Sequence, residues 1–331
     1  MKKTFQTLLA AGLVLAMGGC SAGSTASEEK EDVIHVTVVK QLDHASLDEI
    51  ANAITDELDA AAKEKGIKIE YGEVQSGQND ASNLKTIFDG AVADKTDVII
   101  PIATLAAQTA VTSTMNTDIP VVYAAVSDPE AADLTGLKNV TGTSDALDTD
   151  KIMDMMLAQN KDLKKVGLLY SKSETNSEKA IAEAKKYLDE KGISYEEKTG
   201  NTNDEVLAAV SSLIADKADA VFTPTDNVVM ASEITVAQEL TKAGIPHYAG
   251  ADSFVTSGAL ATCGVNYKEL GKKTADLAIE AAQKGTDDLD DFYTMDGGII
   301  TVNTETAEAL GVDPDIYKDF GELNKVTTQK D

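Results

Sequence analysis

The sequence predicts an α/β fold with two Rossmann-like lobes, each built on a parallel sheet. Short segments rich in Val and Ile alternate with segments of helical periodicity along most of the chain, beginning at Val33. Alternation of this kind is typical of parallel sheets that carry helices on both faces. A chain of 331 residues is long enough for two domains of ordinary size.

Recurring landmarks indicate that the two lobes are similar. A Lys-Gly-Ile run starts at Lys65 and again at Lys191, and an Ile-Pro pair with the same spacing starts at Ile119 and again at Ile245. A third pair of landmarks has nearly that spacing, namely Asp97 and Asp219. We interpret the two halves as products of a duplication. The alternative is that any two α/β halves have similar residues at the ends of their helices and strands, without a common origin.

The elements of the first lobe follow in order from a buried strand at 33–39. The next segment has a helical period of apolar residues from Leu47, and Ser46 and Glu49 have the spacing of a capping box at its start. Gly66 is expected to end this helix. The remaining elements are expected as a strand at 67–71, a helix near 80–93, a strand at 97–101, a helix after Thr104 and a strand at 119–123.

The second lobe repeats this order. Its elements are expected as a strand at 166–170, a helix at 177–191, a strand that begins in the Lys-Gly-Ile run at 191–193, a helix near 204–216, a strand at 219–224, a helix from about 227 and a strand at 245–248. A helix at 267–283, a strand near 298–302 and a helix after Asn303 end the chain. We assign 33–143 with about 267–297 to lobe 1 and 144–266 to lobe 2. The tail at 298–331 is not assigned to either lobe.

The first twenty residues have the layout of a secretory signal. Lys2 and Lys3 precede a short apolar run at 8–17, and small residues lead to Cys20. The segment resembles the bacterial lipobox, which implies cleavage before Cys20, with residues 1–19 as the signal peptide, and lipid attachment to the sulfur of Cys20. Residues 20–32 are small, polar and charged, and we expect a flexible tether there. The alternative is an ordinary secretory signal with an incidental cysteine.

Composition narrows the class of protein. The net charge of −27 disfavours binding to nucleic acid or anionic lipid. Cys263 lies in an apolar stretch and is expected to be a buried core residue. No later segment is apolar enough to span a membrane. The dinucleotide, phosphate-loop, zinc and nucleophile-elbow motifs are missing, so we expect no enzyme activity, cofactor or metal site, although hydrolysis by two carboxylates stays open.

Ligands of doubly wound sheets bind beyond the carboxyl ends of the strands. Four sets of loops lie there, and all are rich in hydroxyl, amide and carboxylate groups: 40–46, 101–105 with 124–129, 170–177, and 224–227 with 250–254. Backbone N–H groups at helix starts suit a carboxylate, and acidic side chains suit an ammonium, so that together they suit a zwitterion.

Each of these groups also has a purely structural explanation. Asp128 with its following proline could start a turn, and Asn176 or Ser177 could cap a helix. A lone histidine such as His44 is usually a polar loop residue. Tyrosines end three of the strands and could line a pocket or fill the core: Tyr123, Tyr170 and Tyr248.

The order of the loop motifs carries a family resemblance. His-Ala-Ser-Leu-Asp (44–48), Ser-Asp-Pro (127–129), Asn-Val-Thr-Gly (139–142), Tyr-Ser-Lys-Ser-Glu-Thr-Asn-Ser (170–177), Thr-Asp-Asn (225–227) and Ser-Gly-Ala-Leu (257–260) follow one another. Together they resemble the substrate-binding lipoproteins of ABC importers, in the group that includes tryptophan- and tyrosine-binding members. The resemblance covers nearly the whole chain after the signal.

This resemblance implies the type I periplasmic-binding-protein fold, with three crossovers between the lobes and the ligand buried between them. Ser173, Glu174, Asn176 and Ser177 would hold the head group of an amino acid, with Thr225, Asp226 and Asn227 beside them. Asp128, next to Ser127, or Asp252 would face the ammonium. His44 and the tyrosines, including Tyr170, would line the pocket for the side chain of the ligand.

The resemblance also implies the partners. The protein would act as a monomer outside the cytoplasm, attached to the membrane by a lipid anchor, and would deliver an amino acid, expected to be aromatic, to an ABC permease with its ATPase. Contacts made by both lobes exist only when the lobes close, so the ligand would shift the equilibrium toward the closed form. The competing functions are a sensor subunit for a receptor kinase and a surface enzyme on the same scaffold.

Overall fold

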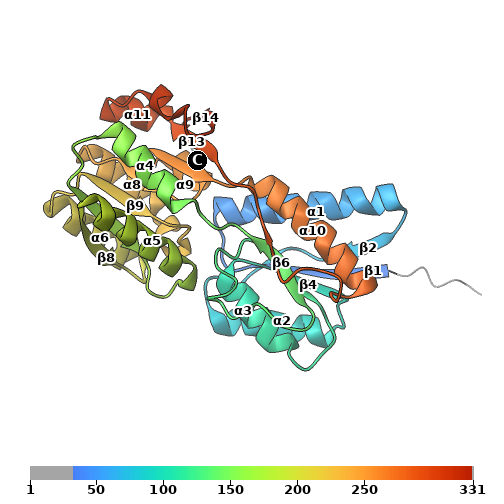
Figure 1. The fold of residues 1–331 in the computed structure, drawn as a ribbon. Helices are drawn as coiled ribbons and strands as arrows, with labels where there is room; N and C mark the ends of the chain where they lie inside the picture. Colours follow the sequence, from blue (N-terminus) through green and yellow to red (C-terminus); the bar gives the residue numbers. More distant parts are fainter. Residues whose placement is uncertain (1–32, 330–331) are drawn as a thin grey trace, which may run out of the picture. The chain divides into compact units, whose positions relative to one another are not determined.

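The computed structural model describes residues 33–329, and the predicted signal peptide and tether lie outside this range. Within it, the chain forms two seven-stranded sheets, each with helices on both faces (Figure 1). The prediction of an α/β fold with two lobes of mainly parallel strands is confirmed.

The sheet of lobe 1 is entirely parallel. Its order is β12-β6-β5-β4-β1-β2, with β3 beside β1. The strands are β1 (Val33–Lys40), β2 (Lys68–Tyr71), β3 (Gln75–Ser76), β4 (Val98–Ile102), β5 (Val121–Tyr123), β6 (Val140–Ser144) and β12 (Tyr293–Thr294).

Alternate residues of these strands pack against different pairs of helices. Ile100 belongs to the core beneath α1 (Ala45–Lys65) and α10 (Tyr267–Lys284), whereas Ile99 packs with α2 (Ala81–Ala93) and α3 (Thr104–Thr114). The two pairs of helices therefore cover opposite faces of the sheet, as Figure 1 shows.

The sheet of lobe 2 has the order β14-β13-β11-β10-β9-β7-β8 and is parallel except for the pair β11–β13. Its strands are β7 (Lys165–Tyr170), β8 (Ser194–Thr199), β9 (Ala220–Thr223), β10 (His247–Ala249), β11 (Ala261–Gly264), β13 (Ile299–Asn303) and β14 (Glu322–Val326). Its helices are α4 (Thr149–Gln159), α5 (Thr175–Lys191), α6 (Asn203–Ala215), α7 (Asn227–Met230), α8 (Glu233–Lys242), α9 (Asp252–Thr256), α11 (Thr304–Leu310) and the 3-10 helix η1 (Pro314–Tyr317).

The chain passes between the two sheets three times. It leaves lobe 1 after β6, returns between β11 and α10, and leaves again between β12 and β13. Strands β13 and β14 place the C-terminal tail, which the sequence left unassigned, in the sheet of lobe 2. Three crossovers are the topology expected for a type I periplasmic-binding-protein fold.

Glycine ends α1 of lobe 1 and α5 of lobe 2, at Gly66 and Gly192, where φ is 64° and 68°. Only glycine adopts this left-handed conformation without steric cost, which explains the recurring Lys-Gly-Ile run. The expected capping box is wrong. Helix α1 begins at Ala45, one residue before Ser46, so the Ser46 hydroxyl lies inside the first turn and bonds the hydroxyl of Ser253 instead.

The tyrosines that end strands fill the core. Tyr123 is completely buried and donates to the carbonyl oxygen of Asp291 at 3.3 Å. Tyr248 is also buried, and its hydroxyl lies 2.7 Å from that of Tyr317. Cys263 is a buried free cysteine, as predicted.

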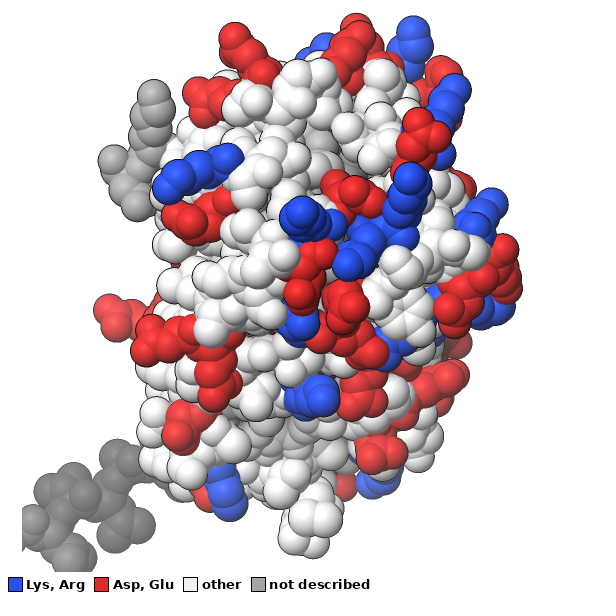
Figure 2. All heavy atoms as spheres, turned by 90° about the vertical axis from the view of Figure 1, so that its left-hand side faces the viewer, with Lys and Arg blue, Asp and Glu red and all other residues white. Residues whose placement is uncertain are grey.

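Charged groups of both signs are scattered over the face of the molecule that Figure 2 draws. Acidic and basic side chains are interspersed on the face drawn in Figure 2, with more acidic than basic groups. Among residues 33–329, none of the helices is long and apolar enough to cross a membrane.

Candidate functional site

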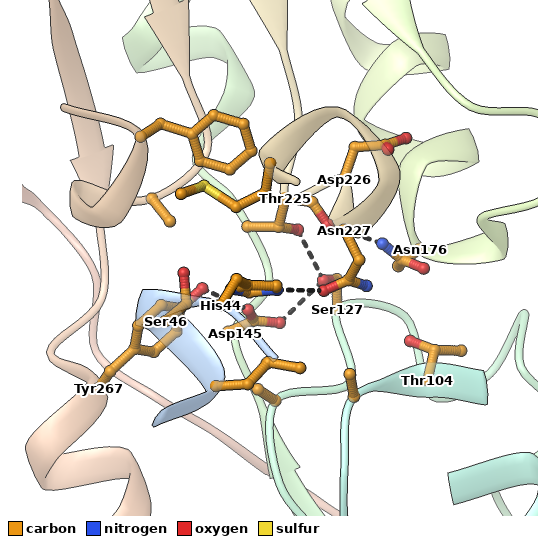
Figure 3. A pocket seen from close by; sticks show the side chains of 16 residues that line it. His44, Ser46, Thr104, Ser127, Asp145, Asn176, Thr225, Asp226, Asn227 and Tyr267 are labelled. Carbon is orange, nitrogen blue, oxygen red and sulfur yellow. Dashed lines mark hydrogen bonds between the residues drawn. The ribbon is translucent and has the colours of Figure 1, made fainter. Parts of the chain in front are cut away.

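A small cavity of about 20 Å³ lies where the carboxyl ends of strands from both sheets meet (Figure 3). Lobe 1 lines it with three segments that follow β1, β4 and β5, and lobe 2 lines it with the start of α5 and the segments that follow β9 and β10. Two further lining residues, Asp145 and Tyr267, come from the first and second crossovers. This volume holds about one water molecule, so a larger ligand would enter only when the lobes move apart.

Polar contacts across the cavity join the two lobes. Ser127 Oγ after β5 lies 3.0 Å from Thr225 Oγ1 after β9, and His44 Nε2 lies 3.0 Å from Asn227 Oδ1. The hydroxyls of Ser46 and Ser253 form a third contact. The lobes are therefore in contact around the cavity.

Asp226 is a structural residue of the loop that follows β9. Its Oδ2 accepts from the backbone N–H of Ser171 and from Ser177 Oγ, both at 2.7 Å, and its Oδ1 caps α7 by accepting from Val229 N at 2.9 Å. Burial raises the pKa of this carboxyl, although the three donors favour the charged form. The carboxylate is thus largely satisfied by the protein itself.

Glu174 stands behind the cavity and connects the lobes. Its Oε1 accepts from Gln41 Nε2 of lobe 1 at 3.0 Å, and its Oε2 accepts from Asn227 Nδ2 of lobe 2 at 2.6 Å. Burial, followed by the nearby charge of Asp226, raises the pKa of Glu174 to about 7. Gln41 is held in turn by Asn79 and by the backbone N–H of Leu105.

Two buried polar atoms of the lining have no partner among the described residues, and these are His44 Nδ1 and Thr104 Oγ1. Asn227 Nδ2 donates to Glu174, so Asn227 Oδ1 must accept from His44 Nε2. Burial lowers the pKa of His44 and favours the neutral ring, which then has an acceptor at Nδ1. Both atoms are available to a ligand.

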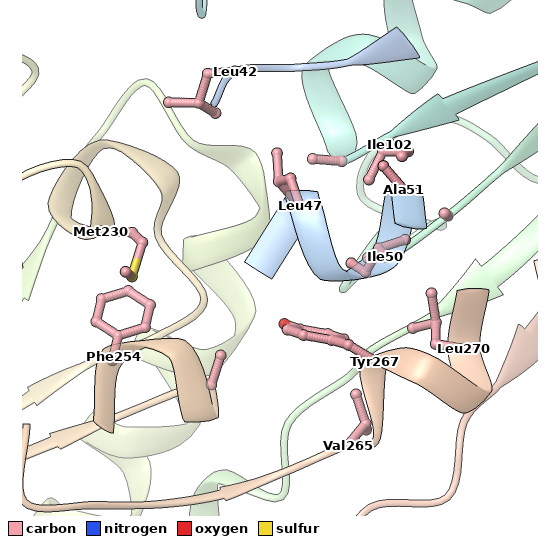
Figure 4. Packing of buried hydrophobic residues seen from close by; sticks show 14 of the residues in the cluster. Leu42, Leu47, Ile50, Ala51, Ile102, Met230, Phe254, Val265, Tyr267 and Leu270 are labelled. Atoms are coloured by element: carbon pink, nitrogen blue, oxygen red, sulfur yellow. The ribbon is translucent and has the colours of Figure 1, made fainter. Parts of the chain in front are cut away.

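The rest of the lining is apolar and aromatic. Figure 4 shows Phe254 beside Met230, and Tyr267 near the first turns of α1, where Leu47 also lies. Ala103, at the start of α3, has a φ of 78°, a conformation that an alanine rarely adopts and that is often found at functional sites. The cavity therefore offers flat apolar walls together with polar groups.

The structure divides the twelve predicted ligand-binding residues into three sets. Six of them line the cavity: His44, Ser127, Asn176, Thr225, Asp226 and Asn227. Glu174 and Ser177 lie behind these and hold Asn227 and Asp226 in place.

The other four lie elsewhere. Ser173 is exposed, Asp128 caps a turn through Ala131 N, and Tyr170 donates to Glu197 at 2.7 Å. Asp252 lines a separate groove between α1, α9 and α10.

Several lining residues were not predicted as contacts, among them Ser46, Thr104, Asp145, Phe254 and Tyr267. Asp145 and Tyr267 lie where the chain passes from one sheet to the other, after β6 and after β11, and that position is the one signal that could have found them. No group of three potential metal ligands occurs within residues 33–329.

Comparison with known proteins gives the family. Residues 35–315 match the family of ABC transporter substrate binding proteins. The chain belongs to this family. Members of this ABC transporter family bind a substrate outside the cytoplasm and do not convert it.

Relatives of this substrate-binding protein include a tyrosine-binding protein of Clostridioides difficile (strain R20291). The two are 34% identical over 93% of this chain and 92% of the relative. A domain from Streptococcus pneumonia in complex with L-Trp superposes with a TM-score of 0.77 at 28% identity, over 88% of this chain and 99% of that one.

A ligand-free, open substrate-binding protein with adhesive properties from Clostridium difficile superposes with a TM-score of 0.66 at 30% identity, over 89% of this chain and 100% of that one. The structure is thus more similar to the ligand complex than to the open protein, in spite of the lower sequence identity.

Proposed function

We propose that this substrate-binding protein serves an ABC importer and captures an aromatic α-amino acid between its two lobes. The observation that carries the proposal is the cavity itself, because it is lined from both lobes and combines two aromatic rings, Phe254 and Tyr267, with hydroxyl, amide and carboxylate groups. Flat apolar walls favour a ring-bearing side chain. The relative named for tyrosine and the complex with L-Trp support the same ligand class.

The carboxylate of the ligand would be bound by neutral donors. The chain has 29 lysines and no arginine, and no lysine lines the cavity. The unpartnered Thr104 hydroxyl at the start of α3, together with Ser46 in the first turn of α1, would therefore receive the ligand carboxylate, where the helix dipoles favour negative charge.

Capture would be coupled to lobe closure. A ligand that contacts residues of both lobes gains these contacts only in the closed form, and it shifts the hinge equilibrium by the free energy of that difference. The closed protein, a monomer, would then deliver the ligand to the permease and its ATPase. Lipid on Cys20 would keep it at the membrane, and labelling of the protein with radioactive palmitate in its host would test this attachment.

A thermal-shift series against the twenty L-amino acids tests the ligand class. We expect at least one of tyrosine, tryptophan and phenylalanine to stabilise the protein. A ligand at about 100 times its dissociation constant adds roughly 2.7 kcal/mol to the free energy of unfolding, which raises Tm by several degrees. The D-enantiomers serve as matched controls. If none of the three aromatic amino acids raises Tm, the proposed ligand class is wrong.

A further inference from the structure

Asp145 is a buried carboxylate on the first crossover, immediately after β6, and it lines the cavity (Figure 3). Only 3% of its surface is exposed. Its Oδ1 accepts from Ser127 Oγ of lobe 1 at 2.8 Å, and its Oδ2 accepts from Tyr267 Oη, at the start of α10, at 3.0 Å. Two segments thus fix its orientation.

No positive charge compensates this carboxylate within the described residues. Both of its side-chain partners are neutral hydroxyls, and it takes part in none of the ion pairs found in residues 33–329. Burial raises its pKa, as expected for a carboxyl away from water. A buried carboxylate without a counter-charge is costly, so such a group either takes up a proton or pairs with a cation.

Asp145 also has unused acceptor capacity, in contrast to the other acids nearby. A carboxylate can accept about four hydrogen bonds, and the side-chain contacts of Asp145 use one on each oxygen. Asp226 already accepts from three protein donors. Glu174 bonds Gln41 and Asn227 and does not line the cavity. The neutral ring of His44 adds a second free acceptor, at Nδ1.

We propose that Asp145, on the first crossover between the lobes, accepts hydrogen bonds from the primary ammonium group of the ligand and so recognises the ligand's positive charge. The inference rests on the proposed function, in which the ligand is an amino acid. It assigns the ammonium to a residue other than Asp128 or Asp252, whose carboxylates serve a turn and a separate groove. The amino group thereby becomes a requirement for binding.

Pairs of ligands that differ in one group test this requirement on the unmodified protein. L-tyrosine is compared with 3-(4-hydroxyphenyl)propionate, and L-tryptophan with indole-3-propionate, by calorimetric titration. A hydrogen bond to a charged group corresponds to about a 10- to 150-fold change in affinity. We expect loss of the amino group to weaken binding at least this much. A propionate that binds as tightly as its amino acid would overturn the proposal.

Asp145→Asn removes the charge and retains the shape of the side chain, whose amide can still bond both Ser127 and Tyr267. We expect this variant to bind the L-amino acid about 10- to 150-fold more weakly and to bind the matching propionate as well as the unmodified protein does, or better. The matched control is Asp128→Asn, which removes an acid outside the cavity and should leave both affinities unchanged.

The outcomes separate the two proposals. Binding of no aromatic amino acid by the unmodified protein contradicts the proposed function. Binding of L-tyrosine or L-tryptophan with equal losses for amino acid and propionate in Asp145→Asn contradicts only the role of Asp145. If the variant does not fold, the ligand pairs on the unmodified protein decide the question.

Discussion

Glu174 illustrates how one residue can be important to a site without touching the ligand. The family resemblance implies a head-group contact, but in the structure both carboxylate oxygens bond protein amides, those of Gln41 in lobe 1 and Asn227 in lobe 2. The same burial that makes these bonds strong disfavours the charge, and the pKa of Glu174 rises to about 7. We therefore treat Glu174 as a contact between the lobes.

Glu174→Gln should change how stability depends on pH. The folded protein holds the proton of Glu174 up to about pH 7, whereas the unfolded chain loses it near the ordinary value of 4.5. The stability linked to this proton is therefore fully present below pH 4.5 and is lost as the pH rises through 7. We expect the unmodified protein to lose up to about 3 kcal/mol over this window relative to the variant, measured by urea unfolding at each pH.

Other titrating groups near Glu174 are Asp226 and His44, and both remain in the variant. The control is Glu178→Gln, the same substitution on an exposed position of the same helix. If the free energy of unfolding depends on pH in the same way for the unmodified protein and for Glu174→Gln, the pKa of Glu174 is not raised in the folded protein.

At this scale the sequence predicted the chemistry of the site better than its geometry. Polar residues at strand ends were correctly expected to gather, and His44, Ser127 and Asn227 do line the cavity. Sequence could not separate ligand contacts from caps, because both use the same donors and acceptors. Asp128 holds a turn, whereas Asp145 lies in a crossover that carries no motif.

At the scale of the elements, α10 packs closely against α1. Gly271 of α10 lies against α1, where an added Cβ would be 2.6 Å from Ala53 Cβ and 2.8 Å from the carbonyl oxygen of Ile50. Figure 4 shows Ile50 of α1 and Leu270 of α10 in the same apolar cluster, beside Tyr267. This contact positions Tyr267 at the cavity.

Gly271→Ala should destabilise the protein by about 1–3 kcal/mol, because the backbone of α1 cannot move away without disturbing the core. Gly90→Ala is the matched control, since Gly90 is an exposed residue of α2 with open space around its Cβ position. There the better helix propensity of alanine should stabilise by up to about 1 kcal/mol. Chemical unfolding measures the change in the free energy of unfolding for each variant. A change in the same direction for both variants would contradict close packing at Gly271.

Elements with a strong periodic signal were predicted well and short ones were not. Helices α1, α2, α5 and α6 match their expected ranges to within a few residues. The expected helix from about 227 is instead two helices, α7 and α8, separated at Ala231–Ser232. Strands β3 and β12 have two residues each, too few for any alternation to show.

At the scale of the whole molecule, described over residues 33–329, the repeated sequence landmarks predicted that the two lobes are similar. Which strands pair with one another is known only from the structure. The antiparallel neighbour β13 and the strand β14 join the second sheet through pairings between segments far apart in the chain. Such pairings depend on tertiary contacts, which periodicity does not report. The contacts between the lobes are of this kind also.

The contact between Gln41 and Glu174 should contribute to lobe closure even without a ligand, because neither residue lines the cavity. We expect Gln41→Ala and Glu174→Ala each to shift the ligand-free protein toward more open forms. The double variant should be no more open than the more open of the two single variants. The coupling energy between the two substitutions should be about 1 kcal/mol, which corresponds to roughly a fivefold shift in the ratio of open to closed forms.

Spin labels at the exposed positions Met115 in lobe 1 and Ile234 in lobe 2 would report the populations as a distance distribution. Lys85→Ala, which removes an ion pair within α2 alone, is the control and should leave the distribution unchanged. Additive effects of the two lobe variants would mean that each acts within its own lobe, through partners such as Asn79 and Asn227. A coupling energy isolates the contact between the lobes, because effects inside each lobe cancel in the cycle.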